Sequence, residues 1–235
     1  MRIDAAISPV EIDTLSERDL SATTAIVFDV LRATSTMVTA LANGVAEIYP
    51  VASIPEAAGL KEIMPRALLA GERRGLRFDG FDLGNSPLDY RKLGAERVIA
   101  LSASCSAALR ACAGAGRVLI GSLLNMGALV EHLKAENPES LLLVCAGTAR
   151  DPAIEDLFAA GMVCSNFPEA TMSDAAKITA SVFRKYQEDP LHCLHESRRG
   201  RELMADGQRD DIRWCARRSL YAVIVEMRDG VVFTL

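Results

Sequence analysis

The sequence lacks the usual signs of a partner with a large charged surface. It has no run of Lys and Arg, and 26 basic against 31 acidic residues give a formal net charge of -5 at pH 7. This balance argues against nucleic acid or an anionic membrane surface as the main partner. No uncharged apolar run approaches the roughly 18 residues of a membrane span, and residues 1–13 carry charges where a signal peptide needs an apolar stretch. We therefore predict a cytoplasmic protein with no nucleic-acid or membrane partner.

The cysteines and histidines give no motif for a structural metal or a disulfide framework. The six cysteines include no C-x-x-C pair, and several lie in apolar stretches. We expect reduced thiols in a cytosolic protein. His192 and His195 could share a helical face, but two ligands do not make a structural zinc site.

Short apolar runs alternate with helical stretches along most of the chain. The predicted strands are 24–28, 47–51, 67–70, 97–101, 118–120 and 141–145, and the helices between them begin near residues 34, 53, 104 and 126. This order predicts an α/β fold, a three-layer α/β/α arrangement with a mainly parallel sheet. Helices at 153–164, 173–188 and 196–218 follow, and a terminal hairpin turns at Asp229-Gly230.

We expect one domain spanning residues 1–235, because no Pro-, Ser- and Gly-rich linker divides the chain. Two related βαβαβ units, at about residues 24–72 and 97–148, are one interpretation of a repeat offset of 70 to 76 residues. Oligomeric state is open, and a homodimer is one possibility.

Polar residues follow the predicted strands, where ligands bind in open parallel sheets. Asp29, Glu72, Ser104 and the segment 147–156 each follow a strand, so four loops should face one pocket. In the first loop, Asp29 and Arg32 precede Thr34 and Ser35, which begin a helix whose free amides would suit a phosphate. The alternative is that Thr34 or Ser35 simply caps the helix.

The loop GERRGLRFDGFDLGNSP, residues 71–87, has six charges, four glycines and two phenylalanines without helical or strand periodicity. Irregular segments of this length usually form binding or lid loops. A haloacid-dehalogenase-type nucleophile loop is a competing interpretation of the segment around Asp29. It requires a second aspartate two residues later, where this chain has Leu31.

The motifs FDVLRATST (residues 28–36) and GERRGLRFDGFDLGNSP resemble those of the 2-phosphosulfolactate phosphatase family. The resemblance continues through IGSLLN, AGT, AIEDLFAAG and the segment 173–176. It implies a magnesium-dependent enzyme of coenzyme M biosynthesis that hydrolyses 2-phosphosulfolactate, a small anionic phosphoester, to sulfolactate and phosphate. Over the last sixty or so residues only a general similarity is evident.

The resemblance and the residue chemistry together suggest the site. Carboxylates suit Mg²⁺, and arginines and hydroxyls suit phosphate and sulfonate. Asp29, Glu72 and Arg32 are the candidate catalytic residues. The candidate metal ligands are Asp29, Glu72, Glu155 and Asp156, although the last two also suit a helix start, where acids complement the dipole. The candidate substrate-binding residues are Arg32, Thr34, Ser35, Arg73, Asn85, Ser86, Ser104 and Ser106, with Arg74 and Arg77 as further cations.

One segment departs from the family pattern. Where the family commonly has a T-T-N-G-T-R-A segment, Ser104, Cys105 and Ala107 replace the Asn, Gly and Arg. The loss of an amide, a flexible backbone position and a cation suggests altered substrate preference or weaker activity. A non-catalytic anion-binding homologue is therefore the alternative function. Cys105 at a helix start could act as a nucleophile, but a lone cysteine is more often a packing residue.

Overall fold

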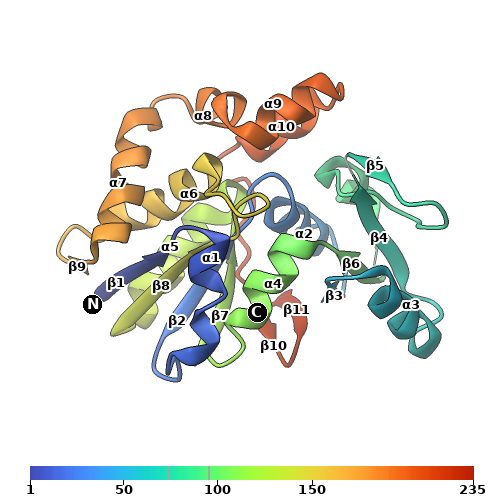
Figure 1. Ribbon diagram of the computed structural model, residues 1–235, viewed down its shortest axis with the longest axis horizontal. Helices are drawn as coiled ribbons and strands as arrows, with labels where there is room; N and C mark the ends of the chain where they lie inside the picture. The colour runs from blue at the N-terminus through green and yellow to red at the C-terminus, as the bar shows by residue number, and fades with distance from the viewer. Residues whose placement is uncertain (74, 95) are drawn as a thin grey trace.

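A computed structural model describes residues 1–73, 75–94 and 96–235, so Arg74 lies outside the described residues. Among these residues, the strands form an 11-stranded sheet in the order β5-β4-β6-β3-β11-β10-β7-β2-β8-β1-β9. Figure 1 shows the helices distributed around this sheet, with α8, α9 and α10 gathered at one end. The prediction of an α/β fold with a mainly parallel sheet is confirmed.

The strands are β1 (Arg2–Ala6), β2 (Thr24–Phe28), β3 (Glu47–Val51), β4 (Leu68–Arg73), β5 (Leu76–Arg77), β6 (Arg97–Leu101), β7 (Arg117–Gly121), β8 (Ser140–Cys145), β9 (Thr171–Met172), β10 (Val225–Arg228) and β11 (Val231–Thr234). The α-helices are α1 (Pro9–Ile12), α2 (Ala33–Ala42), α3 (Ile54–Ile63), α4 (Ala103–Ala111), α5 (Met126–Glu136), α6 (Ile154–Ser165), α7 (Asp174–Tyr186), α8 (Pro190–Glu196), α9 (Arg198–Ala205) and α10 (Arg209–Cys215). Three 3₁₀ turns are η1 (Leu15–Glu17), η2 (Pro87–Lys92) and η3 (Leu123–Asn125).

The C-terminal hairpin lies in the middle of the sheet. β10 pairs antiparallel with β7, and β11 pairs antiparallel with β3, so the hairpin joins two groups of parallel strands that run in opposite directions. Its turn at Asp229-Gly230 has positive φ at both residues, as two-residue hairpins require. The sequence correctly predicted the hairpin, but not its central position, which depends on pairing with strands more than 100 residues earlier.

The two predicted βαβαβ units are interleaved. β2 lies between β7 and β8, and β6 lies between β3 and β4. The first strand of each unit therefore pairs with the second and third strands of the other unit. Both units contribute strands to both halves of the sheet, while their common origin stays a prediction.

Helices cover both faces of the sheet and bury separate apolar clusters. One cluster joins Val27 and Val144 of the strands to α1, α2 and α4, whereas the other joins Ile26 and Leu143 to α5, α6 and α7. Neighbouring strand residues point to opposite faces, so adjacent positions such as Ile26 and Val27 enter different clusters. This confirms the three-layer expectation.

The segment 71–87 is more regular than we predicted. β4 extends to Arg73 and turns back into β5, with Glu72 opposite Arg77 in an antiparallel pair. η2 begins at Pro87. The strand β1 was also missed, because its sequence RIDAA contains two charges in five residues. Among the described residues, no helix has the length and apolar character needed to cross a bilayer.

Candidate active site

A cavity of about 600 Å³ lies at the carboxyl ends of five strands that come from both parallel groups of the sheet. Loops after β2, β3, β4, β6 and β8 line it, together with the first turns of α9. The convergence of four loops predicted from the sequence is confirmed, and the loop after β3, residues 52–55, is an addition. The polar side chains around the cavity are those of Asp29, Arg32, Ser53, Glu72, Arg73, Asn85, Ser102, Ser104, Thr148, Arg199 and Glu202.

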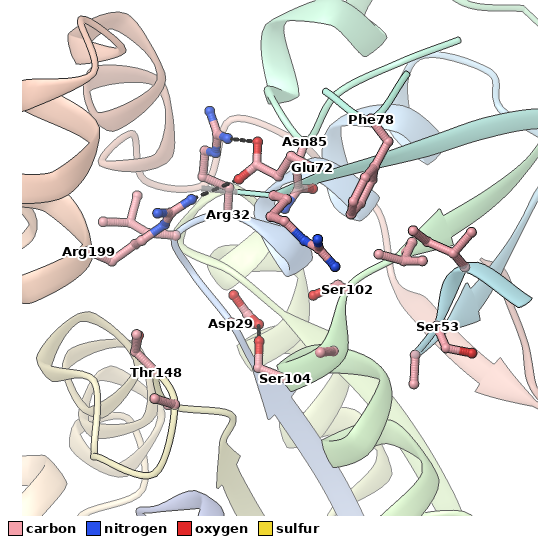
Figure 2. Close-up of a pocket in the computed structure, with 18 of the residues that line it drawn as sticks. Asp29, Arg32, Ser53, Glu72, Phe78, Asn85, Ser102, Ser104, Thr148 and Arg199 are labelled. Atoms are coloured by element: carbon pink, nitrogen blue, oxygen red, sulfur yellow. Dashed lines mark hydrogen bonds and ion pairs between the residues drawn. The ribbon is translucent and has the colours of Figure 1, made fainter. Parts of the chain in front are cut away.

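Asp29 lies at the end of β2 and is largely buried, yet it lines this cavity. Its Oδ2 accepts a hydrogen bond from the Ser104 hydroxyl at 2.8 Å, which Figure 2 shows as a dashed line. Burial raises the pKa of Asp29, and the negative charge of Glu72 adds to this, although Ser104 and the Ala33 amide oppose the shift. Asp29 is therefore a carboxylate in a fixed orientation, whose charged form is disfavoured by burial and favoured by the charge of Arg199.

Asp29 accepts hydrogen bonds from the first backbone amides of α2. The Ala33 amide donates to Asp29 Oδ1 at 3.4 Å, and the Thr34 amide donates to the Asp29 carbonyl at 2.9 Å. The hydroxyl of Thr34 accepts from the Asp29 amide, and the hydroxyl of Ser35 donates to the Val30 carbonyl. Both side chains are fully buried and do not line the cavity, and they contact the backbone of the loop before α2. The capping alternative is wrong, because Arg32 is the N-cap residue of α2.

Glu72, at the end of β4, lies between two arginines. Its Oε1 accepts from Arg199 Nη2 at 2.7 Å, and its Oε2 accepts from Arg32 Nη2. Figure 2 shows the carboxylate with an ion pair on each side. Because both oxygens are engaged by cations, Glu72 is held in one orientation by Arg32, just before α2, and by Arg199 of α9.

Arg32 is the most deeply buried cation of the site, with a side chain 1% exposed. Its Nη1 donates to Asp211 and, at 2.7 Å, to Gln208 Oε1. Ser86 donates to the other oxygen of Asp211 at 2.7 Å and lines a second cavity of about 500 Å³ behind Arg32. Both terminal nitrogens of Arg32 are therefore occupied by protein groups, and its predicted direct contact with substrate stays a prediction.

Arg73 and Asn85 line the cavity from the segment 71–87. Arg73 is exposed, and its guanidinium lies 5.7 Å from the centroid of the Phe78 ring. Phe78 in turn packs against Phe81 at 5.1 Å between ring centroids. This aromatic pair gives Arg73 a stacking surface at the cavity edge, and Figure 2 shows Phe78 on the opposite side from Arg199.

Glu155 and Asp156 are buried in the first turn of α6 and do not line the cavity. Asp156 accepts from the Val30 amide at 2.8 Å and from the Gly147 amide at 3.0 Å, so it ties together the loops after β2 and β8. Burial raises the pKa of Glu155 to about 7, and the charge of Asp29 contributes to this shift. Burial also raises the pKa of Asp156 well above its usual range, with Glu155 and Asp29 adding to it.

The segment that departs from the family pattern supplies one hydroxyl to the site. Ser104 donates to Asp29, whereas Ser106 donates to the Val51 carbonyl and is buried away from the cavity. Cys105 is fully buried, and burial raises the pKa of its thiol well above the usual value. The packing interpretation of Cys105 therefore fits the structure, and the nucleophile interpretation does not.

The four predicted magnesium ligands do not face one point. Within residues 1–73, 75–94 and 96–235, no three or more His, Cys, Asp and Glu side chains are grouped to hold a metal ion. Glu72 is paired with arginines, and Asp156 with backbone amides. Mg²⁺ often uses one or two carboxylates, completed by water and substrate phosphate. Asp29, with Glu155 as a neighbouring buried acid, fits that smaller requirement.

Sequence reasoning missed the contribution of the C-terminal helices. Arg199 and Glu202 of α9 line the cavity, and Asp211 of α10 and Gln208 hold Arg32. The signal available was weak, because polar helical residues are usually solvent-exposed. Only the folding of α8–α10 across the strand ends makes these residues part of the site.

The fold and the cavity together define an α/β protein built to bind a small anionic molecule at the carboxyl ends of its parallel strands. The chain belongs to the 2-phosphosulpholactate phosphatase family, whose sequence profile matches residues 10–230. It is 35% identical over 218 residues to a protein of Caldicellulosiruptor saccharolyticus, covering 88% of this chain and 90% of the relative. It is also 35% identical over 229 residues to a protein of Carboxydothermus hydrogenoformans, covering 96% and 93%.

A Clostridium perfringens protein is 33% identical over 244 residues, covering 100% of this chain and 97% of the relative. All three relatives carry the name "Probable 2-phosphosulfolactate phosphatase". The family resemblance found in the motifs is thus confirmed over nearly the whole chain, including the C-terminal helices that the motifs did not cover.

Proposed function

We propose that this protein is a magnesium-dependent phosphatase that hydrolyses 2-phosphosulfolactate, or a similar small acidic phosphoester, to sulfolactate and phosphate. The observation that carries the proposal is the juxtaposition of a buried carboxylate, Asp29, with arginines around one cavity in a chain of this family. Arginines neutralise phosphate and sulfonate, and a buried carboxylate can anchor a divalent cation.

The protein's own groups divide the work of binding and orientation. Ser104 and the start of α2 fix the Asp29 carboxylate, and Asp156 fixes the loops on either side of it. Arg73 at the cavity edge is suited to a charged group of the substrate that is not transferred. In hydrolysis, a water oxygen bonds to phosphorus, the phosphorus–ester oxygen bond breaks, and the alkoxide oxygen takes a proton to give sulfolactate.

Magnesium would be held by Asp29, with Glu155 nearby, and when bound would polarise the phosphoryl group and acidify a coordinated water. The fit rests on the donors present: Asp29 lines the cavity as a buried carboxylate, and burial raises its pKa and that of the neighbouring Glu155. A divalent cation would remove the cost of keeping these acids ionised.

The test is phosphate release from 2-phosphosulfolactate and from phospholactate, which lacks the sulfonate, with Mg²⁺ or with a chelator. We expect turnover only with a divalent ion, and loss of turnover in folded Asp29→Asn and Glu72→Gln variants. Asp174→Asn serves as the control, because Asp174 is exposed on α7 and remote from the cavity. Full activity in the chelator would refute the metal requirement.

The same substrate panel separates the alternative function. An anion-binding homologue without catalysis would bind these esters and release no phosphate with any divalent ion. If the departure from the family pattern at residues 102–107 has altered substrate preference, a different acidic ester should be hydrolysed faster under the same conditions. The buried thiols suit a reducing compartment, so the cytoplasm is the proposed location.

A further inference from the structure

The second residue of α9, Arg199, is placed in the cavity by a tight helix–helix junction. Ser197 caps α9, with its hydroxyl accepting from the Gly200 amide at 2.8 Å and donating to the Leu194 carbonyl at 2.8 Å. A Cβ on Gly200 would lie 1.7 Å from the Leu194 carbonyl oxygen, so α8 and α9 approach as closely as glycine allows. The position of Arg199 relative to the strand ends is therefore fixed by the backbone.

The two ion pairs of Arg199 differ in length and in exposure to solvent. Glu72 is 11% exposed and bonds to Nη2 at 2.7 Å, whereas Glu202 is 43% exposed and bonds to Nη1 at 3.2 Å across one helical turn. Exposed pairs of this second kind contribute little, because solvent screens them and two flexible side chains must be ordered. Glu202 is therefore the partner that an incoming anion can displace.

Arg199 also differs from the other cations that line the cavity. Arg32 is almost fully buried with both terminal nitrogens on protein groups, and Arg73 lies on the Phe78 side of the cavity. Both terminal nitrogens of Arg199 are also paired, but its Nη1 pairs with the half-exposed Glu202. Arg199 is 17% exposed, and its charge acts on both Asp29 and Glu155. Among the cavity-lining arginines of the described residues, Arg199 is thus one that is partly accessible and also acts on the buried carboxylates.

We infer that Arg199 binds the phosphoryl group of the substrate by exchanging Glu202 for a phosphate oxygen, while Glu72 holds its guanidinium in place. This inference rests on the proposed function and identifies which cation receives the transferred group. Glu202 then acts as an internal competitor for the phosphate, occupying Nη1 until the substrate arrives. The C-terminal helices would in this way supply a binding residue to a site otherwise made by the sheet.

The test uses inorganic phosphate as the probe, measured by calorimetry on the full chain, so that it does not depend on turnover. Arg199→Gln should weaken phosphate binding at least tenfold, about the effect of one charge-assisted hydrogen bond. Glu202→Gln should strengthen phosphate binding about two- to threefold, as expected for removing a weak competing pair. Arg201→Gln removes the same charge from an exposed position of α9 and should leave binding unchanged.

Several outcomes would overturn the inference. If Arg199→Gln lowers the melting temperature but the folded variant binds phosphate like the wild type, Arg199 only stabilises the packing of α9 against β4. Weaker binding in Glu202→Gln would contradict the exchange, and this variant keeps the test valid should Arg199→Gln fail to fold. Absence of phosphate binding by the wild type would also count against it. Phosphate binding that depends on Arg199, without turnover of any ester, would instead refute the proposed function and leave this inference standing.

Discussion

Replacing Arg32 with lysine should test whether the buried guanidinium is a structural connector or a substrate contact. Arg32 bridges Glu72 on one side and Asp211 with Gln208 on the other. Lysine retains the charge, but its single ammonium cannot reach acids on both sides as the planar guanidinium does. At least one of Glu72 and Asp211 should therefore lose its contact with residue 32, while keeping its other partner, Arg199 or Ser86.

The size of the effect follows from burial. The side chains of Arg32, Glu72 and Asp211 are 1%, 11% and 6% exposed, so solvent cannot replace the lost contact. Removing one partner of a buried pair typically costs about 3–5 kcal/mol, and retention of the charge places Arg32→Lys near 3 kcal/mol, at the lower end. For a chain of this size that corresponds to a fall in melting temperature of roughly 10 °C.

The measurement is urea unfolding of four proteins: wild type, Arg32→Lys, Asp211→Asn and the double variant. Because both single changes break the same ion pair, their costs should not add, and the cycle should show a coupling free energy of about 1 kcal/mol or more. Arg201→Lys is the control, because Arg201 is exposed on α9. Phosphate binding to the folded variants is measured in parallel.

One result would refute the reasoning. If Arg32→Lys is as stable as Arg201→Lys but loses phosphate affinity, the planar guanidinium of Arg32 contacts the substrate, as we predict from the sequence. The buried ion pairs would then be partners that the substrate replaces.

Three further changes test other parts of the structure. Burial gives Glu155 a folded pKa of about 7 against 4.5 for the free side chain, so the folded state holds its proton to higher pH and stability should fall from pH 5 to 8 by up to about 3 kcal/mol in a chelator. Glu155→Gln should remove much of this slope in urea titrations, and parallel slopes would contradict the assignment. Gly200→Ala should cost about 1–3 kcal/mol by overpacking, whereas Gly114→Ala, where no atom lies within 4 Å of the new Cβ, should be neutral or stabilising in the same thermal unfolding assay. Arg73→Gln should raise KM for 2-phosphosulfolactate more than for phospholactate, and equal increases would place Arg73 on the phosphate instead.

The local sequence determined most of the elements of this protein. The runs at 24–28, 47–51 and 97–101 were recognisable as strands because apolar, β-favouring residues are bounded by turn residues, and their limits match the structure. The alternation of strands and helices predicted a parallel sheet, and that in turn predicted a site beyond the carboxyl ends of the strands. Asp29, Glu72 and Ser104 were found on that basis, and all three line the cavity.

Tertiary structure alone decided the contacts of those residues. Arg32 looked like a ligand for phosphate in the sequence, because the acids that pair with it are far from it along the chain. Asp211 lies 179 residues from Arg32, and Arg199 lies 127 residues from Glu72. Which acid meets which arginine depends on how α9 and α10 pack across the strand ends, and that packing depends on burial and close backbone approach instead of local pattern. The same reason explains why the C-terminal hairpin could be predicted as a hairpin but not placed at the centre of the sheet.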